Sequence, residues 1–119
     1  KTLWVELLPQ EIFKNSYKIK KYSLKNAFDY DTIQNVAFIR SRKEGDRADI
    51  HGGTKTLKKL FNEEKIPPEL RDGVAVVADS AGVVWVEGLG AARRARLADS
   101  TKTVAVVKRH ALQESSSEG

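Results

Sequence analysis

Cysteine and methionine are both absent from this chain of 119 residues. Without cysteine the chain has neither disulfides nor thiolate–metal sites, which fits a reducing compartment and predicts a cytoplasmic location. Apolar runs stay as short as Val83–Val86, whereas a membrane-spanning helix needs about 20 apolar residues. No secretory leader follows Lys1. We therefore expect no membrane partner, and a chain that is a piece of a longer protein or processed at its start.

Catalytic and metal-binding candidates are scarce as well. The only histidines are His51 and His110, and no His/carboxylate cluster has the spacing of a metal site. His51 is the one internal candidate for a general base, but it lies in a glycine-rich loop and has no evident nucleophile beside it. We expect it to face solvent, and we expect this chain to hold no catalytic residue and no cofactor.

The periodicity of apolar residues predicts an α+β fold in a single small domain, with about six mostly antiparallel strands and one main helix. The domain is expected over residues 1–111, and residues 112–119 are expected to be disordered. A loop or short turn is predicted for Phe28–Gln34. Asp79–Gly82 has turn composition and predicts a hairpin. The expected strands are Thr2–Leu8, Ser16–Leu24, Asn35–Arg42, Val74–Ala78, Val83–Glu87 and Thr103–Lys108.

The main helix is predicted over residues 54–65, capped by Gly53 or Thr54 and ended before Pro67-Pro68. Its apolar stripe is opposed by a basic stripe of Lys55, Lys58, Lys59 and Asn62. The glycines before it have two readings: helix entry alone, or an anion site at the helix N-terminus beside Lys55. The GxxxxGK[ST] spacing of a nucleotide-binding loop is absent.

Basic residues are in mild excess, with a formal net charge of +5. Residues 40–71 hold nine basic and six acidic side chains, so the excess leans toward the first two thirds of the chain. If the strand end and the helix pack together, these cations converge on a phosphate-binding surface; otherwise they are a solvated face. Both readings remain open, as they do for Arg93, Arg94 and Arg96. Asp46 and Trp85 are predicted to be structural, the first in a turn and the second in the core.

Four segments, taken in order, resemble one known family. Arg40–Arg47 resembles the R-x-R-x-x-G-D-R signature of the C-terminal domain of tRNA(Ile)-lysidine synthases. Gly53–Phe61 is similar to that family's G-x-K-x-L-K-K-x-F segment, Lys65–Arg71 to its K-I-P-x-x-x-R element, and Val83–Leu89 to its strand ending in G-L. The motif core spans about residues 38–89. Gly90 departs from the family, which commonly has arginine after G-L.

The resemblance implies a function for the parent protein. Such enzymes use ATP, with magnesium, to activate the wobble cytidine of tRNA(Ile), and free lysine then attacks to form lysidine, which allows AUA decoding. The ATP and lysine sites belong to an N-terminal domain with an S-G-G-x-D-S loop, which this chain lacks. This chain is then expected to dock tRNA(Ile), toward the acceptor stem. The residues expected to contact RNA are Arg40, Arg42, Lys43, Arg47, Lys55, Lys58, Lys59, Arg71, Arg93 and Arg94.

A structural or oligomerisation role without RNA contact is the alternative. The apolar segment Thr2–Leu8 motivates it, because such a strand at a sheet edge can pair with another chain. A homodimer of the parent enzyme is a further expectation.

Overall fold

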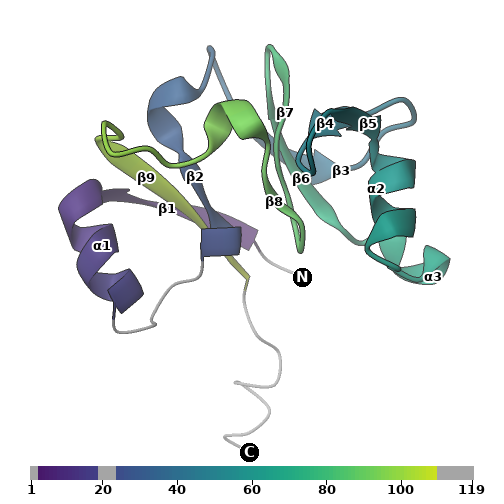
Figure 1. Ribbon diagram of the computed structural model, residues 1–119, viewed down its shortest axis with the longest axis horizontal. Coiled ribbons are helices and arrows are strands. Elements are labelled where there is room, and N and C mark those ends of the chain that lie inside the picture. The colour runs from purple at the N-terminus through teal and green to yellow at the C-terminus, as the bar shows by residue number, and fades with distance from the viewer. Residues whose placement is uncertain (1–2, 19–23, 110–119) are drawn as a thin grey trace, which may run out of the picture.

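Two stacked β-sheets, each covered on its outer face by a helix, form the fold of the computed structural model (Figure 1). The structure describes residues 3–18 and 24–109. The order of layers is a helix, a three-stranded sheet, a four-stranded sheet, and a second helix with a small hairpin. The predicted α+β class is confirmed.

The three-stranded sheet joins the two ends of the described chain. Its order is β1-β9-β2, formed by β1 (Leu3–Pro9), β9 (Thr103–Arg109) and β2 (Ala27–Asp29). β1 and β9 run antiparallel over their full lengths, from Leu3 opposite Arg109 to Pro9 opposite Thr103. Helix α1 (Gln10–Lys18) covers the outer face, where buried Phe13 packs on Val104 and Val106. β1 therefore lies at a sheet edge, as predicted.

The centre of the four-stranded sheet is formed by β6 (Ala75–Asp79) and β7 (Gly82–Val86), in which every residue except Gly82 is buried. These two strands form the predicted hairpin, with Asp79 opposite Gly82. Gly82 has a φ of +124°, a conformation that favours glycine. The sheet is completed by β3 (Phe38–Ser41) on the β6 side and by the short β8 (Gly90–Ala91) on the β7 side.

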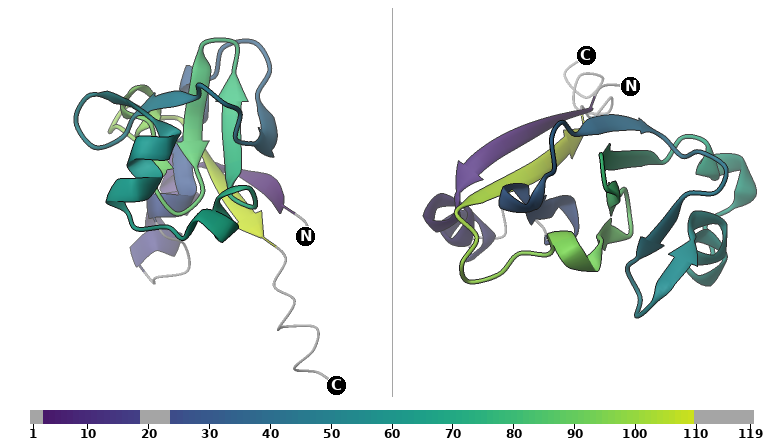
Figure 2. Two further views of the ribbon diagram at one scale, coloured as in Figure 1. Left: turned by 90° about the vertical axis from the view of Figure 1, so that its right-hand side faces the viewer. Right: turned by 90° about the horizontal axis from the view of Figure 1, so that it is seen from above.

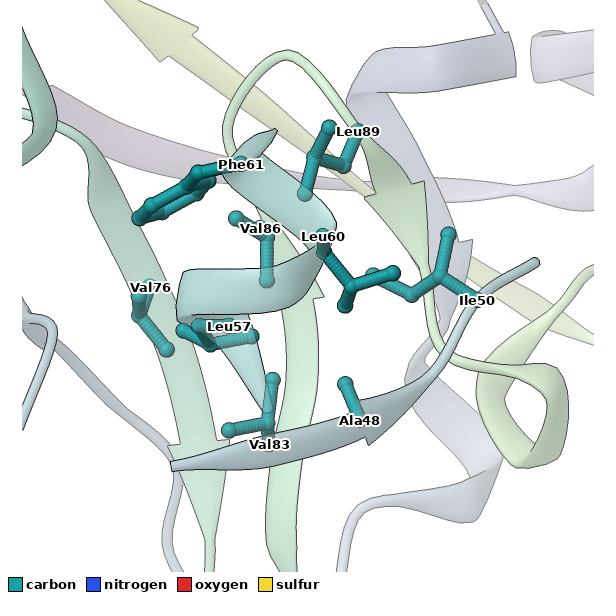
Figure 3. Close-up of a cluster of buried hydrophobic side chains, with 9 residues drawn as sticks. All are labelled: Ala48, Ile50, Leu57, Leu60, Phe61, Val76, Val83, Val86 and Leu89. Atoms are coloured by element: carbon teal, nitrogen blue, oxygen red, sulfur yellow. The ribbon is translucent and has the colours of Figure 1, made fainter. Parts of the chain in front are cut away.

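The outer face of the four-stranded sheet is covered by the motif-rich part of the chain. A hairpin of β4 (Arg47–Asp49) and β5 (Thr54–Thr56) leads into α2 (Leu57–Glu63) and the short α3 (Pro68–Arg71). Leu57, Leu60 and Phe61 are the buried residues of α2, and their side chains point to the sheet in Figure 3. Burying each such side chain contributes about 1.5–3 kcal/mol.

The space between the sheets holds the largest buried side chain, Trp85. It packs with Phe28 and Ala105 of the three-stranded sheet. Its indole Nε1–H donates to the carbonyl of Lys25 at 2.7 Å, so the one polar group of the ring is satisfied. Lys25 lies in the 3₁₀ turn η1 (Leu24–Asn26). The prediction that Trp85 belongs to the core is confirmed.

The strand predicted at Ser16–Leu24 is wrong over Ser16–Lys18, which belong to α1, and at Leu24, which belongs to a 3₁₀ turn. Residues 19–23 lie outside the described part. Tertiary contacts fix this helix. The Gln10 side chain donates to the carbonyls of Ala98 and Thr101 at 2.9 and 2.7 Å, and Phe13 is buried. Those contacts override the alternation of Tyr17 and Ile19 with Lys18 and Lys20, on which the predicted strand rested.

The loop predicted at Phe28–Gln34 is only partly right. Phe28 and Asp29 belong to β2, and the 3₁₀ turn η2 (Tyr30–Thr32) follows. All three β2 residues are buried, so this strand is short and central to the packing although its composition resembles a turn.

The main helix begins later than predicted, because Thr54–Thr56 pair with Arg47–Asp49 before the helix can start. Thr56, rather than Gly53 or Thr54, is the N-cap, and its hydroxyl accepts from the N–H of Lys59 at 3.1 Å. Gly52 and Gly53 turn the hairpin, and the N–H of Gly53 donates to the Asp49 carboxylate. These glycines are therefore not the entry to a helix, and Lys55 lies on a strand.

The predicted disordered tail, residues 112–119, lies outside the described residues. In the part of the chain that the structure describes, no helix has the length and apolar character needed to cross a membrane.

Candidate nucleic-acid interface

Asp46 organises the junction between the β3–β4 loop and the start of α2. Its carboxylate accepts two hydrogen bonds from the Arg40 guanidinium, at 2.8 and 3.1 Å, and one from the N–H of Lys43 at 2.7 Å. Its carbonyl accepts the N–H of Leu57, the first residue of α2, at 2.9 Å. The prediction that Asp46 is structural is confirmed, and its carboxylate is held by the Arg40 side chain and by the backbone N–H of Lys43. One residue therefore ties strand, loop and helix together at this junction.

The pKa of the Asp46 carboxyl lies below its ordinary value. Burial raises this pKa, but the hydrogen bonds from Arg40 and from Lys43, with their positive charges, outweigh burial. A carboxyl whose folded-state pKa is depressed stabilises the fold above its unfolded pKa of about 3.9. That stability is lost as the pH falls through the folded-state value.

Asp46→Ala is expected to destabilise the domain by about 1–3 kcal/mol, because the loop loses its charged hydrogen bonds. Chemical denaturation at pH 7 and at about pH 3 measures this. The difference between variant and parent should shrink at the lower pH, where the parent carboxyl begins to take up a proton. An unchanged difference at both pH values would contradict the role given to the Asp46 charge.

A shallow hollow of about 390 Å³ lies beside this junction. Arg42, Lys43 and Lys58 line it, together with the carboxylates of Glu44, Asp46 and Asp72. Arg42 forms an ion pair with Asp72 at 3.3 Å. The guanidinium groups of Arg42 and Arg71 both lie over the Phe61 ring, 5.6 and 5.8 Å from its centroid. The strand end and the helix therefore do pack together, which was the condition for the basic residues to converge.

Four of the predicted RNA-contacting cations have no ion-pair partner among the described residues. Lys43, Arg47, Lys58 and Lys59 are exposed, and none of their charged groups forms an ion pair with a residue in 3–18 or 24–109. Arg47 is opposite Thr56, the N-cap of α2, while Lys58 and Lys59 stand in the first turn. Lys43 and Lys58 line the same hollow, and the positive charges of all four residues are available to an external anion such as a phosphate.

The other six predicted cations have partners inside the domain. Arg40 is held by Asp46 and Arg42 by Asp72. The remaining four are bound as follows: Lys55 to Glu63 at 3.0 Å, Arg71 to the Asn62 side chain at 2.8 Å and the Ile66 carbonyl at 2.9 Å, Arg93 to Asp49 at 3.7 Å, and Arg94 to Asp79 at 2.6 Å. Five of these cations already have an anion close by and gain less from a phosphate, whereas Arg71 is held by neutral oxygen acceptors. All six remain predictions with a weaker case.

Arg94 is the clearest example of a cation with an internal role. It lies on the 3₁₀ turn η3 (Arg93–Ala95) and reaches the Asp79 carboxylate, whose side chain is fully buried. Asp79 also accepts from the N–H groups of Gln34 and Ala81, each at 2.9 Å. No nearby residue in the sequence reveals this pair, since 15 positions separate its members. Asp72 and Asp79 are not among the predicted site residues. Their carboxylates nevertheless determine which arginines are free to bind an external anion.

His51 departs from its prediction in one respect. Its Nε2 lies 2.7 Å from a carboxylate oxygen of Glu64, and both side chains are about one third exposed. The imidazole is exposed, as expected, and it also has a partner on the C-cap of α2. Within residues 3–18 and 24–109, no group of three histidine or carboxylate side chains is placed to hold a metal ion.

Comparison with known proteins places this chain in a family. The sequence model of the TilS substrate C-terminal domain matches residues 37–108, more than half of the chain and the segment that builds the junction. The chain belongs to this family. The resemblance found in the motifs of residues 38–89 is thereby confirmed.

Named relatives agree with the family. The tRNA(Ile)-lysidine synthase of Caldanaerobacter subterraneus subsp. tengcongensis is 40% identical over 83 residues, which are 68% of this chain and 18% of that protein. The enzyme of the same name from Clostridium perfringens (strain 13) is 33% identical over 101 residues, 83% of this chain and 21% of that protein. The chain thus spans about a fifth of the length of these relatives.

Solved structures show the same architecture. The crystal structure of a TilS C-terminal domain superposes with a TM-score of 0.66 at 26% identity, covering 92% of this chain and 83% of the other. An N-terminal fragment of the phenylalanyl-tRNA synthetase β-subunit from Pyrococcus horikoshii has a TM-score of 0.63 at 14% identity, covering 89% of this chain and 38% of that one. The second likeness shows a shared fold alone.

Proposed function

We propose that this TilS-family domain docks tRNA(Ile) for a tRNA(Ile)-lysidine synthase. The contact is made through the cations at the start of α2 that have no internal ion pair. One observation carries the proposal: Lys43, Arg47, Lys58 and Lys59 lie on the β3–β4 loop, on β4 and in the first turn of α2, exposed and without ion pairs to the described residues. Phosphate contacts by such cations supply salt-dependent affinity without reading sequence.

The contact is assigned to the acceptor stem of the tRNA. A double-stranded RNA stem is recognised mainly through its backbone and shape, because side chains cannot read its deep major groove. Exposed lysines and an arginine at this strand–helix junction suit that mode. No aromatic side chain lines the hollow beside the junction, so stacking on unpaired bases is not the mode proposed there.

The chemistry is assigned to the part of the parent enzyme outside this chain. There, ATP with magnesium would activate the wobble cytidine and free lysine would be the nucleophile, in the cytoplasm. This domain supplies binding and orientation, since holding two reactants in place lowers the entropic part of a barrier. A structural role without RNA contact is the competing function.

Fluorescence anisotropy with labelled tRNA(Ile) tests the proposal on the 119-residue chain. Binding is expected with a dissociation constant of roughly 1–100 µM near physiological salt, the range of phosphate-driven contacts. Absence of binding even at low salt would contradict docking by this domain and favour the structural role.

A further inference from the structure

An apolar groove lies on the side of the domain where the edges of the two sheets meet. It has a volume of about 330 Å³ and is lined by Val5 and Leu7 of β1, by Phe38 and Ile39 of β3, and by residues between η2 and β3. None of its ten lining residues is charged, although 31% of the chain is charged. A partner that binds here gains from apolar burial rather than from ion pairs.

Large apolar side chains protrude around this groove. Exposed fractions are 64% for Val36, 58% for Phe38, 47% for Leu7, 42% for Tyr30 and 38% for Ile39. These are five of the nine exposed large apolar side chains in the described part of the chain. Scattered apolar side chains on a surface need no explanation, but a contiguous group around a hollow marks an interaction site.

The backbone along the groove is also open to a partner. β1 is the outer strand of the three-stranded sheet and β3 the outer strand of the four-stranded sheet. In Figure 2, seen from above, β1 and β3 run along the same upper side of the molecule. Each edge strand has hydrogen-bonding groups without a ladder partner, and natural proteins usually protect such edges with charge or a cover. Here the groove side carries no charge, which indicates a cover.

The relatives indicate what the cover is. This chain spans 18–21% of the length of the tRNA(Ile)-lysidine synthases of Caldanaerobacter subterraneus and Clostridium perfringens, and the matched family is a C-terminal domain. In proteins of that length further polypeptide precedes β1, and Val5 and Leu7 of this strand line the groove. Tethering gives such a neighbour an effective concentration in the millimolar range.

We propose that this groove is the docking surface for the polypeptide that precedes β1 in the full-length enzyme, which packs an apolar segment between the edges of β1 and β3. The contact fixes the orientation of the RNA-binding junction relative to the rest of the enzyme. The proposal stands independently of tRNA docking, since the groove and the cations of the junction share no residue.

Hydrogen exchange compares the full-length enzyme with the 119-residue chain without any substitution. Backbone amides of residues 36–41 should exchange at least about tenfold more slowly in the full-length enzyme, because the neighbouring polypeptide closes the edge. Equal exchange in the two proteins would overturn the proposal. Protection that rises with concentration in the short chain would also overturn it, and would assign the groove to a second copy.

Val36→Asp with Phe38→Asp tests the same surface by substitution. In the full-length enzyme the pair should raise the rate of protease cleavage ahead of β1 by about tenfold, since the docked state is abolished. In the 119-residue chain the melting temperature should hardly change, because both side chains are exposed there. Leu70→Asp is the matched control: Leu70 is also 58% exposed, but it lies on α3. If Leu70→Asp raised the rate of protease cleavage as much as the groove variant does, the result would contradict docking at the groove.

Discussion

Asp79→Ala is expected to destabilise the domain by about 2–3 kcal/mol, the upper part of the range for removing the charged acceptor of buried hydrogen bonds. The Asp79 side chain is fully buried and receives hydrogen bonds from Arg94 and from two backbone N–H groups. Its removal leaves those N–H groups and the partly buried Arg94 guanidinium without their acceptor. Urea denaturation of the 119-residue chain measures the change.

The same carboxyl makes stability depend on pH. Burial raises the pKa of Asp79. The hydrogen bonds from Arg94, Gln34 and Ala81 lower it by more than burial raises it, so the pKa lies below its ordinary value. The stabilisation is fully present above the unfolded pKa of about 3.9 and is lost as the pH falls through the folded-state pKa. As the pH is lowered, the free energy of unfolding of Asp79→Ala should therefore fall less steeply than that of the parent.

Asp72→Ala is the matched control, because it also removes an arginine's carboxylate partner but at an exposed site. Exposed ion pairs contribute about 0–1 kcal/mol, so this change should stay within that range. An equal destabilisation by both substitutions would contradict the structural role of Asp79. The ion pair also matters for experiments on RNA binding, because Arg94 is the partner of Asp79. Arg94→Ala would weaken binding through the loss of stability as well as through the loss of charge.

Reversing Lys58 and Lys59 to glutamate is expected to weaken tRNA(Ile) binding by about 100-fold. Each lysine contact with a phosphate is a charged hydrogen bond, worth about 1.5 kcal/mol or more, and about 1.4 kcal/mol is a factor of ten. Both side chains are exposed in the first turn of α2, so the fold should survive. Anisotropy titration at one fixed salt concentration gives the ratio.

Lys14→Glu with Lys102→Glu is the control for net charge. It changes the formal charge by the same amount, but Lys14 lies on α1, on the opposite side of the molecule from α2 (Figure 1). Lys102 lies in the adjoining loop, where its carbonyl accepts from the N–H of Gln10. This control should reduce the affinity only slightly. Equal reductions would indicate attraction by overall charge and would contradict a localised site.

The sequence predicts the strong repeating patterns and misses the short elements. The β6–β7 hairpin was predictable because Asp79–Gly82 has turn composition between two apolar runs. The hairpin of β4 and β5 was missed because each strand has three residues, too few to establish a period. The start of α2 was misplaced for the same reason, since Thr54–Thr56 pair as a strand before Thr56 caps the helix.

For the candidate site, the sequence predicted the cations but not which of them are free. The charge distribution located Arg40 and Arg42 in the same basic stretch, residues 40–71, as Lys58 and Lys59. Only the structure shows that the two arginines are held by carboxylates and that, among the described residues, the lysines are not. Arg42 and Asp72 are 30 positions apart in the sequence, so no local pattern predicts their contact. Availability of a charge is a property of tertiary packing.

The dependence of tRNA(Ile) affinity on salt concentration tests the central claim most directly. Four phosphate contacts predict that the logarithm of the binding constant falls with the logarithm of salt concentration at a slope of about −3.5. Replacing Lys58 and Lys59 with alanine should make the slope shallower by about 2, because each lysine–phosphate pair accounts for roughly 1. A slope near zero, or one that the alanine variant leaves unchanged, would contradict docking of RNA at the start of α2.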